Sequence, residues 1–294
     1  MKTDKPLIEG GFRKAGSVAV VIKCPSSNRE PYLVQFADST QTQALISELV
    51  LRRLEVDTLL ELDDEDLKSF VVYECQVGSR AFGLSTETSD DDRRGIFMPD
   101  AERHWSLYRL PEQLEFLQGQ DDLVYWELEK FVRLALKANP NILETLWTPH
   151  VTVQTSISER LRSIRSAFLS RHVYKTYSGY VLSQFRRMKK AFEKTGKFKT
   201  KHAMHLLRLQ HSGISALKTG EIMIDVSHHR DLLMKVRHGE FSFQEVSDMA
   251  MQNDVDFQRA FEKTDLPEQP DFATVNDFVI EARRMAIDFW TDNS

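Results

Sequence analysis

The spacing of apolar residues divides the chain into a mixed front part and a helical rear part. Within residues 1–40, short apolar runs such as SVAVVIKC and YLVQF alternate with turn residues, which predicts a hairpin or a small β appendage. Residues 41–54 and 62–70 have helical spacing, and the second of these segments begins with acids suited to a helix N-terminus. Residues 71–77, VVYECQV, are β-branched and aromatic, and we expect a buried strand there.

The next hundred residues mix strand and helix signals. The run GIFMP predicts a second strand that Pro99 stops, and QLEFL allows a further strand. From Asp121 the pattern DDLVYWELEKFVRLALKANP is helical, with its end at Asn139-Pro140. Another helix is predicted to begin at Pro140 with NILETLW.

From about residue 155 onward, every apolar pattern is helical, and several of the segments end at glycine, as helices commonly do. The sequence therefore predicts an α+β protein. A small mixed domain, built on a strand–turn–strand, precedes an all-helical C-terminal domain. We place the divisions at 1–60 for an N-terminal extension with a possible β hairpin and helix, 61–150 for the mixed domain and 151–294 for the helical domain.

Composition limits the class of protein. The chain has 294 residues, 41% of them hydrophobic and 28% charged, with a net charge of −5, so we expect a soluble globular protein that is not a polycation as a whole. No apolar run reaches the roughly 18 residues that span a membrane, and the N-terminus lacks the apolar core of a secretory signal. Cys24 and Cys75 are expected to be reduced, buried thiols in a cytoplasmic protein.

An acidic cluster, SDDD, stands directly before the GIFMP strand. On a strand, Asp90 and Asp92 would point to one face and Asp91 to the other. Two carboxylates on one face repel each other, but they suit a divalent cation. Upstream, Gly78-Ser79 can open a short helix whose N–H groups and hydroxyl bind phosphate. The alternative interpretation is a solvated acidic turn.

The order of strand, Gly-Ser, loop, Asp-x-Asp and strand resembles the signature of the DNA polymerase beta-like nucleotidyltransferase superfamily. Here its residues are Val77, Gly78, Ser79, Asp90 and Asp92. The segments GSRAFGLSTETSDDDRRGIF, YWELEKFVRLALKANPNILETLW, YVLSQF and KHAMHLLRL are similar to a narrower group, the predicted nucleotidyltransferases of RNA repair that are also called RNA ligase-associated. This likeness covers roughly residues 70–285.

The resemblance implies a nucleotidyltransferase domain with a mixed sheet at 61–150. It also implies an enzyme that moves a nucleoside monophosphate from a nucleoside triphosphate (NTP) to a hydroxyl and releases pyrophosphate. Asp90 and Asp92 would bind Mg²⁺ or Mn²⁺, and Gly78 and Ser79 would hold the triphosphate. The superfamily also uses a third carboxylate on a neighbouring strand. Asp122 is the first candidate and Glu115 in QLEFL the second, while a helix N-cap is the structural alternative for Asp122.

Positive charges near the motif have two interpretations. Arg80, Arg93 and Arg94 can neutralise a triphosphate or pair locally with the aspartates. The resemblance implies nucleotide contacts for Arg80, Arg94 and Lys130. Other residues of the family-like segments have structural roles as an equal alternative: Asn139, Asn141 and Glu144.

A basic segment, RRMKKAFEKTGKFKTK, holds eight basic residues against one acid, with Phe185, Phe192 and Phe198 nearby or interleaved. It predicts either a solvated helix face or a surface that contacts RNA phosphates. The candidate nucleic-acid contacts are Arg186, Arg187, Lys190, Lys201 and His205.

Three functions remain open at this level. The first is nucleotidyl transfer to an RNA or tRNA end, which the basic segment favours. The second is the same chemistry on a protein or small molecule, which the net negative charge favours. The third is a nucleotide-binding sensor, against which the two metal-ligating aspartates argue.

Overall fold

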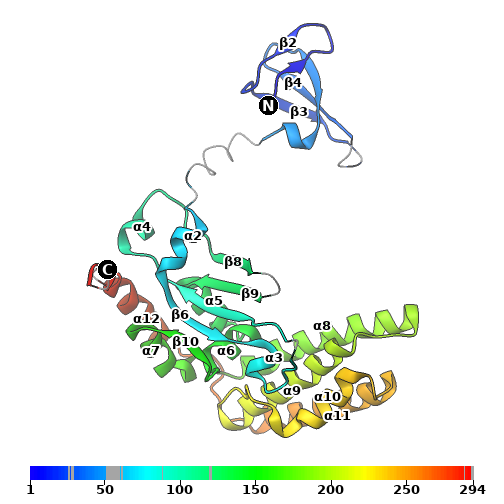
Figure 1. Ribbon diagram of the computed structural model, residues 1–294, viewed down its shortest axis with the longest axis vertical. Coiled ribbons are helices and arrows are strands. Elements are labelled where there is room, and N and C mark those ends of the chain that lie inside the picture. Colours follow the sequence, from blue (N-terminus) through cyan, green and yellow to red (C-terminus); the bar gives the residue numbers. More distant parts are fainter. Residues whose placement is uncertain are drawn as a thin grey trace. The chain divides into compact units, whose positions relative to one another are not determined.

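The computed structural model falls into two compact units, Met1–Leu62 with Ser106–Leu110, and Asp63–Trp105 with Pro111–Ser294 (Figure 1). We describe each unit by itself. The residues that the structure describes are 1–25, 27, 30–50, 60, 62–87, 89–118, 121–287 and 289–292.

The smaller unit is built from short strands. β1 (Lys5–Pro6) pairs with β2 (Phe12–Arg13), and β3 (Ala19–Lys23), β4 (Tyr32–Phe36) and β5 (Gln41–Ala44) form an antiparallel sheet in that order. These strands confirm the β appendage predicted within residues 1–40.

Two predictions for this unit are wrong. The helix predicted from residue 41 is instead β5 followed by a 3₁₀ turn at Ile46–Glu48, because buried Thr42 and Ala44 alternate with exposed or half-buried glutamines. The rest of that predicted helix, 51–54, lies outside the described residues. Cys24 is exposed rather than buried, because it follows the exposed strand β3, whereas Cys75 is buried as expected.

The larger unit centres on a mixed five-stranded sheet. Its strands are β6 (Val71–Gln76), β7 (Arg93–Phe97), β8 (Gln113–Gln118), β9 (Asp121–Glu127) and β10 (Val151–Gln154), in the spatial order β10-β6-β7-β9-β8. β7 and β9 run parallel, and the other neighbours are antiparallel. The strands predicted at VVYECQV, GIFMP and QLEFL are confirmed as β6, β7 and β8.

The helix predicted from Asp121 begins only at Leu128, as α5 (Leu128–Leu136), and β9 takes its first part. Residues 123–127 are all buried, so this central strand shows no alternation that separates it from a buried helix. Glu127, whose carboxylate accepts from the Glu129 N–H at 2.7 Å, is the N-cap of α5. Asp122 is therefore not a helix cap. β10, a short edge strand, was not predicted.

Helices complete the larger unit. α2 (Asp64–Leu67) leads into β6, α3 (Gly78–Ala81) follows it, and α4 (Ala101–Trp105) follows β7. α6 (Pro140–Trp147) and α7 (Ser156–Ser163) flank β10 in sequence. The helical region then continues with α8 (His172–Thr195), α9 (Thr200–Thr219), α10 (Arg230–His238), α11 (Phe243–Lys263), α12 (Phe272–Met285) and α13 (Phe289–Asp292).

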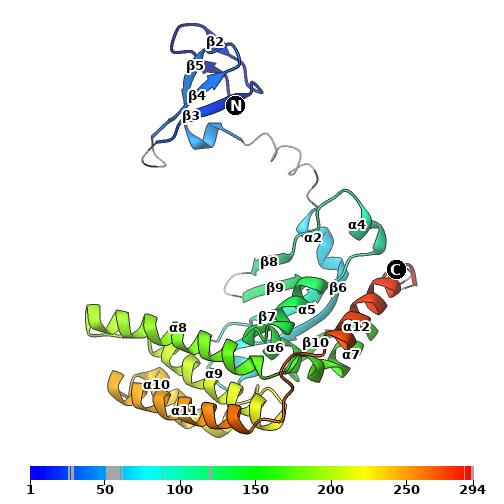
Figure 2. The same cartoon turned by 180° about the vertical axis from the view of Figure 1, so that it is seen from behind.

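The helices from α8 to α11 lie together as a bundle (Figure 2). Gly196, Gly220 and Gly239 end α8, α9 and α10 in the left-handed conformation, as the sequence predicted. One hydrophobic core joins the sheet and the bundle, from Tyr73 and Ile96 to Leu207 and Phe257. The division predicted at residue 150 falls inside this unit and stays a prediction. Within the described residues, no helix has the length and apolarity to cross a membrane.

Candidate active site

Gly78 brings the Gly78-Ser79 motif against the acidic cluster. It follows β6 and Val77, has a φ of +71°, and opens α3. A Cβ at this position would lie 2.6 Å from Asp92 Oδ2. The Val77 N–H also donates to the Asp92 carbonyl at 2.9 Å. The backbone conformation and the close approach both require glycine, and Gly78-Ser79 therefore lies beside Asp92.

The three consecutive aspartates have different surroundings. Asp91 pairs with Arg93 at 2.9 Å and accepts from Gln76 Nε2 at 2.7 Å. These hydrogen bonds, that from Gln76 foremost, lower the pKa of the Asp91 carboxyl. Of the two expectations for Asp91, exposure or pairing with an arginine, the structure shows the pairing. Asp90 is exposed, and Asp92 is half-buried.

The register of β7 and β9 places Asp122 beside Asp92. Arg93 pairs with Leu123 across the two parallel strands, so the preceding residue of each strand, Asp92 and Asp122, stands at the same end of the sheet. Burial raises the pKa of Asp92, and the charges of Asp122 and Asp90 raise it further against the opposing effect of Arg94. The carboxylates of Asp122 and Asp90 thus both act on Asp92.

Glu115 lies one strand farther out. It pairs with Val124 on β8, is exposed, and accepts a hydrogen bond from Gln113. Asp92 is influenced by Asp122 and Asp90 and not by Glu115 among its principal charges. Of the two candidates for a third carboxylate, the structure brings Asp122 to the pair.

The donor set suits a hard divalent cation. Carboxylate oxygens are the ligands that Mg²⁺ prefers, and burial, together with the charges of Asp122 and Asp90, raises the pKa of Asp92, as expected where a cation is needed for charge balance. In the described part of the chain, no three His, Cys, Asp or Glu side chains converge closely enough to enclose a metal ion. Arg94 pairs with Asp122 at 2.7 Å and neutralises it in this conformation.

Arg80 and Arg94 of the motif contact backbone carbonyls, whereas Arg93 pairs with the Asp91 carboxylate. Arg80 donates to the Ser89 carbonyl at 2.7 Å and the Asp90 carbonyl at 3.2 Å. Arg94 also donates to the Asp122 carbonyl at 2.7 Å. Lys130 pairs with Glu112, and it follows the end of β9 opposite to Asp122. The structure therefore does not bring Lys130 to the aspartates.

Comparison with known proteins shows the family to which the chain belongs. Residues 52–281 match the RNA repair pathway DNA polymerase beta family. The chain belongs to this family. The match confirms the resemblance found in the sequence, and it supports nucleotidyl transfer as the activity.

Proteins with sequences similar to this chain occur in a bacterium and in an archaeon. The uncharacterized protein YcgL of Bacillus subtilis (strain 168) is 35% identical over 98 residues, which is 33% of this chain and 38% of that protein. The uncharacterized protein MJ0002 of Methanocaldococcus jannaschii is 29% identical over 159 residues, 53% of this chain and 63% of that protein. The chain thus spans under two thirds of each relative.

A solved structure is also similar. The crystal structure of a nucleotidyltransferase-like protein from Exiguobacterium sibiricum aligns over 73% of this chain and 74% of that chain, with a TM-score of 0.28 and 12% identity.

In this member of the RNA repair pathway DNA polymerase beta family, side chains of α9 and α10 contact the loop after α3. Arg208 on α9 lies over the Phe82 ring at 3.7 Å and forms a buried ion pair with Glu144 at 2.7 Å. Arg230 on α10 donates to the Gly83 carbonyl and, at 3.3 Å, to the Ser85 carbonyl. Glu144 therefore has a structural partner. Sequence reasoning missed Arg230, because no local motif marks a contact across so long a chain separation.

The basic segment covers the second half of α8 and the turn into α9. Arg186, Arg187 and Lys190 are exposed, as are the other cations of the segment. The phenylalanines of this region pack with Phe243 at the start of α11, where Phe192 stacks on it at 4.3 Å. They form a small core of the helix pair, and the cations face solvent.

Proposed function

We propose that this protein transfers a nucleoside monophosphate from an NTP to a hydroxyl on an RNA or tRNA end. One observation carries the proposal. The register of β7 and β9 sets Asp92 beside Asp122, and Gly78 lies against the same Asp92 side chain. Membership in a family described by RNA repair supports an RNA acceptor. The exposed cations of α8 support it as well, because they suit a phosphate backbone.

In this reaction the acceptor oxygen bonds to the α-phosphorus. The bond from that phosphorus to the bridging oxygen of the β-phosphate breaks, and pyrophosphate leaves with the electron pair. Asp122 takes the proton of the attacking hydroxyl. Gly78 and Ser79 receive the triphosphate, since the missing side chain at Gly78 lets a phosphate approach the backbone.

Asp90, Asp92 and Asp122 would hold Mg²⁺ or Mn²⁺ in this proposal. When bound, such ions neutralise charge on the attacking and leaving oxygens. Arg80 positions the loop that carries Asp90 through its two carbonyl contacts. Arg94 positions Asp122 through its carboxylate and its carbonyl.

Label transfer tests the activity and the acceptor together. The full chain is incubated with Mg²⁺, cell RNA, cell protein and each NTP labelled on the α-phosphate. Label in RNA is the expected result. Label in protein would move the acceptor to a protein, and a bound nucleotide without transfer would leave only a sensor.

Two matched carboxylate variants test the site. Asp122→Asn should lower transfer by about 100-fold or more, the usual loss when a group that stabilises the transition state is removed. Glu115→Gln should retain activity, because Glu115 is exposed and one strand away. The double variant Asp90→Ala with Asp92→Ala should abolish transfer. Full activity of that double variant would sink the site assignment.

A further inference from the structure

One face of α9 is directed at the loop that follows Gly78-Ser79. Lys201, His205 and Arg208 are spaced four and three residues apart, so they share this face. Arg208 fixes its direction, because the guanidinium lies over the ring of Phe82, which ends α3. Two helical turns earlier, the charge of Lys201 acts on the Asp92 carboxylate. Lys201 therefore lies on the α9 face that Arg208 directs at the loop after Gly78-Ser79.

α10 adds a further cation to this face. The Thr200 hydroxyl donates to the Arg237 carbonyl at 2.7 Å, which ties the start of α9 to the end of α10. Arg237 itself donates to the Leu84 carbonyl at 3.4 Å. Burial, followed by the positive charges of Arg208, Lys201, His202 and Arg237, lowers the pKa of His205 to about 3. A neutral His205 thus offers an N–H donor among cations.

The positive charge here is not balanced by acids. Glu144 neutralises Arg208 in a buried pair. Lys201, His202 and Arg237, by contrast, have no ion pair with any carboxylate of the residues described. Such a cluster beside a phosphate-binding motif favours a polyanion as its ligand.

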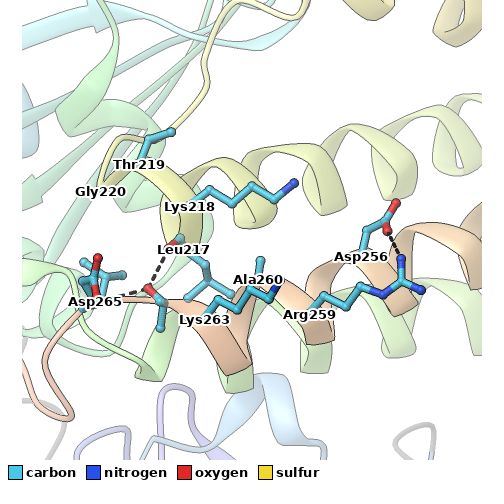
Figure 3. A pocket seen from close by; sticks show the side chains of 11 residues that line it. Leu217, Lys218, Thr219, Gly220, Asp256, Arg259, Ala260, Lys263 and Asp265 are labelled. Atoms are coloured by element: carbon cyan, nitrogen blue, oxygen red, sulfur yellow. Dashed lines mark hydrogen bonds and ion pairs between the residues drawn. The ribbon is translucent and has the colours of Figure 1, made fainter.

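At the opposite end of α9, in contrast to the cluster at Lys201, cations and acids lie together. A hollow of ≈ 580 Å³ lies there, lined by the three cations and two acids labelled in Figure 3 as Lys218, Lys263, Arg259, Asp256 and Asp265. Arg259 pairs with Asp256 at 3.3 Å. Its cations have acidic neighbours, and Lys218 lies roughly 25 Å along α9 from Lys201 at about 1.5 Å per residue. Nothing there calls for an anion.

We propose that Lys201, His205 and Arg237 form the subsite for the pyrophosphate part of the NTP. This assignment rests on the proposed function, because it gives the cluster the leaving group of that reaction. Negative charge grows on the pyrophosphate as its bond to the α-phosphorus breaks, and fixed cations stabilise it. Lys201 and His205 lie on the α9 face that is directed at the loop after Gly78-Ser79, whereas the cations of α8 remain candidates for RNA.

Direct binding of inorganic pyrophosphate, measured by calorimetry without RNA, tests the subsite. Lys201→Ala should weaken pyrophosphate binding about 10-fold or more, the value of one charge-assisted hydrogen bond. Lys201→Arg should restore most of the affinity. Lys218→Ala, an exposed lysine at the other end of the same helix, and Lys190→Ala on α8 are the matched controls and should bind as the unchanged chain does. Circular dichroism checks that all four variants fold.

Equal pyrophosphate affinity in Lys201→Ala and the unchanged chain would overturn the subsite, and so would failure of the unchanged chain to bind pyrophosphate. If Lys201→Ala lost affinity for RNA but not for pyrophosphate, Lys201 would contact the acceptor, and the subsite would be overturned too. Label transfer by the unchanged chain is measured in parallel. If the unchanged chain transfers label but pyrophosphate binding does not depend on Lys201, only the subsite is contradicted. Lys201-dependent binding without any transfer defeats the proposed function only.

Discussion

The two faces of β7 carry the same residue types and use them differently. On one face, Arg93 joins Asp91 to buried Glu74 at 2.9 and 3.1 Å. The hydroxyls of Tyr125 and Thr152 also donate to Glu74. On the other face, Asp92 stands with Asp122 and Asp90, and burial, together with the charges of these two carboxylates, raises the pKa of Asp92.

This difference separates structure from chemistry at neighbouring positions. In the closed network of Glu74, Arg93, Asp91 and Tyr125, each charge has a partner, and burial is outweighed by hydrogen bonds that lower the pKa of Glu74. The open face keeps carboxylates that lack enough positive charge, which costs stability and suits cation binding. The closed face therefore holds the loop, and the open face is free to react.

Replacement of Gly95, at the centre of the closed face, should have the largest effect on stability. Tyr125 reaches Glu74 across Gly95, where a Cβ would lie 2.2 Å from the Tyr73 carbonyl and 2.7 Å from the Tyr125 ring. Gly95→Ala should lower the free energy of unfolding by about 3 kcal/mol. Urea denaturation measures it. Gly179→Ala is the control, because open space surrounds Gly179 on α8 and alanine favours helix.

Removing the cation of the closed network should cost somewhat less. Arg93→Gln leaves the buried Glu74 charge with only two hydroxyl donors, and we expect a loss of about 2 kcal/mol. Arg133→Gln is the control, since Arg133 pairs with Glu129 on an exposed helix surface where such pairs contribute under about 1 kcal/mol. Equal losses in the two variants would show that the network is not closed.

The sequence predicted one face better than the other. Strand alternation was enough to turn Asp91 away from Asp90 and Asp92, because parity is a local property of the chain. It could not place Asp122 on a strand, because β9 is buried on both faces and its apolar run lacks alternation. The contacts of Arg208 and Arg230 with the loop after α3 depend on how α9 and α10 pack, which no spacing in the sequence encodes.

Magnesium should stabilise the chain only through the open face. At a free Mg²⁺ concentration about 10-fold above its Kd, binding to the folded state adds about 1.4 kcal/mol. Thermal unfolding with and without Mg²⁺ should show this gain in the unchanged chain and in Asp91→Asn, but not in Asp92→Asn. An equal Mg²⁺ response in Asp92→Asn would place the metal elsewhere.

The smallest effect is a difference in sign between Asp91 and Asp92. The folded state lowers the pKa of Asp91, so its charge stabilises the protein above the pKa of an unfolded aspartate, and this stability is lost as pH falls through the folded value. The folded state raises the pKa of Asp92, so its charge destabilises the protein once pH exceeds that raised value, and acid removes the cost.

In metal-free buffer at about pH 7, Asp91→Asn should therefore lower the free energy of unfolding and Asp92→Asn should raise it, each by under about 1 kcal/mol because both carboxylates are partly solvated. Toward about pH 3 the Asp92→Asn difference should disappear, whereas the Asp91→Asn difference should only shrink, because the lowered pKa of Asp91 lies below that of an unfolded aspartate. Denaturant titrations at the two pH values measure them. Shifts of the same sign in both variants would remove the distinction between the closed and the open face, since the two aspartates would then share one environment.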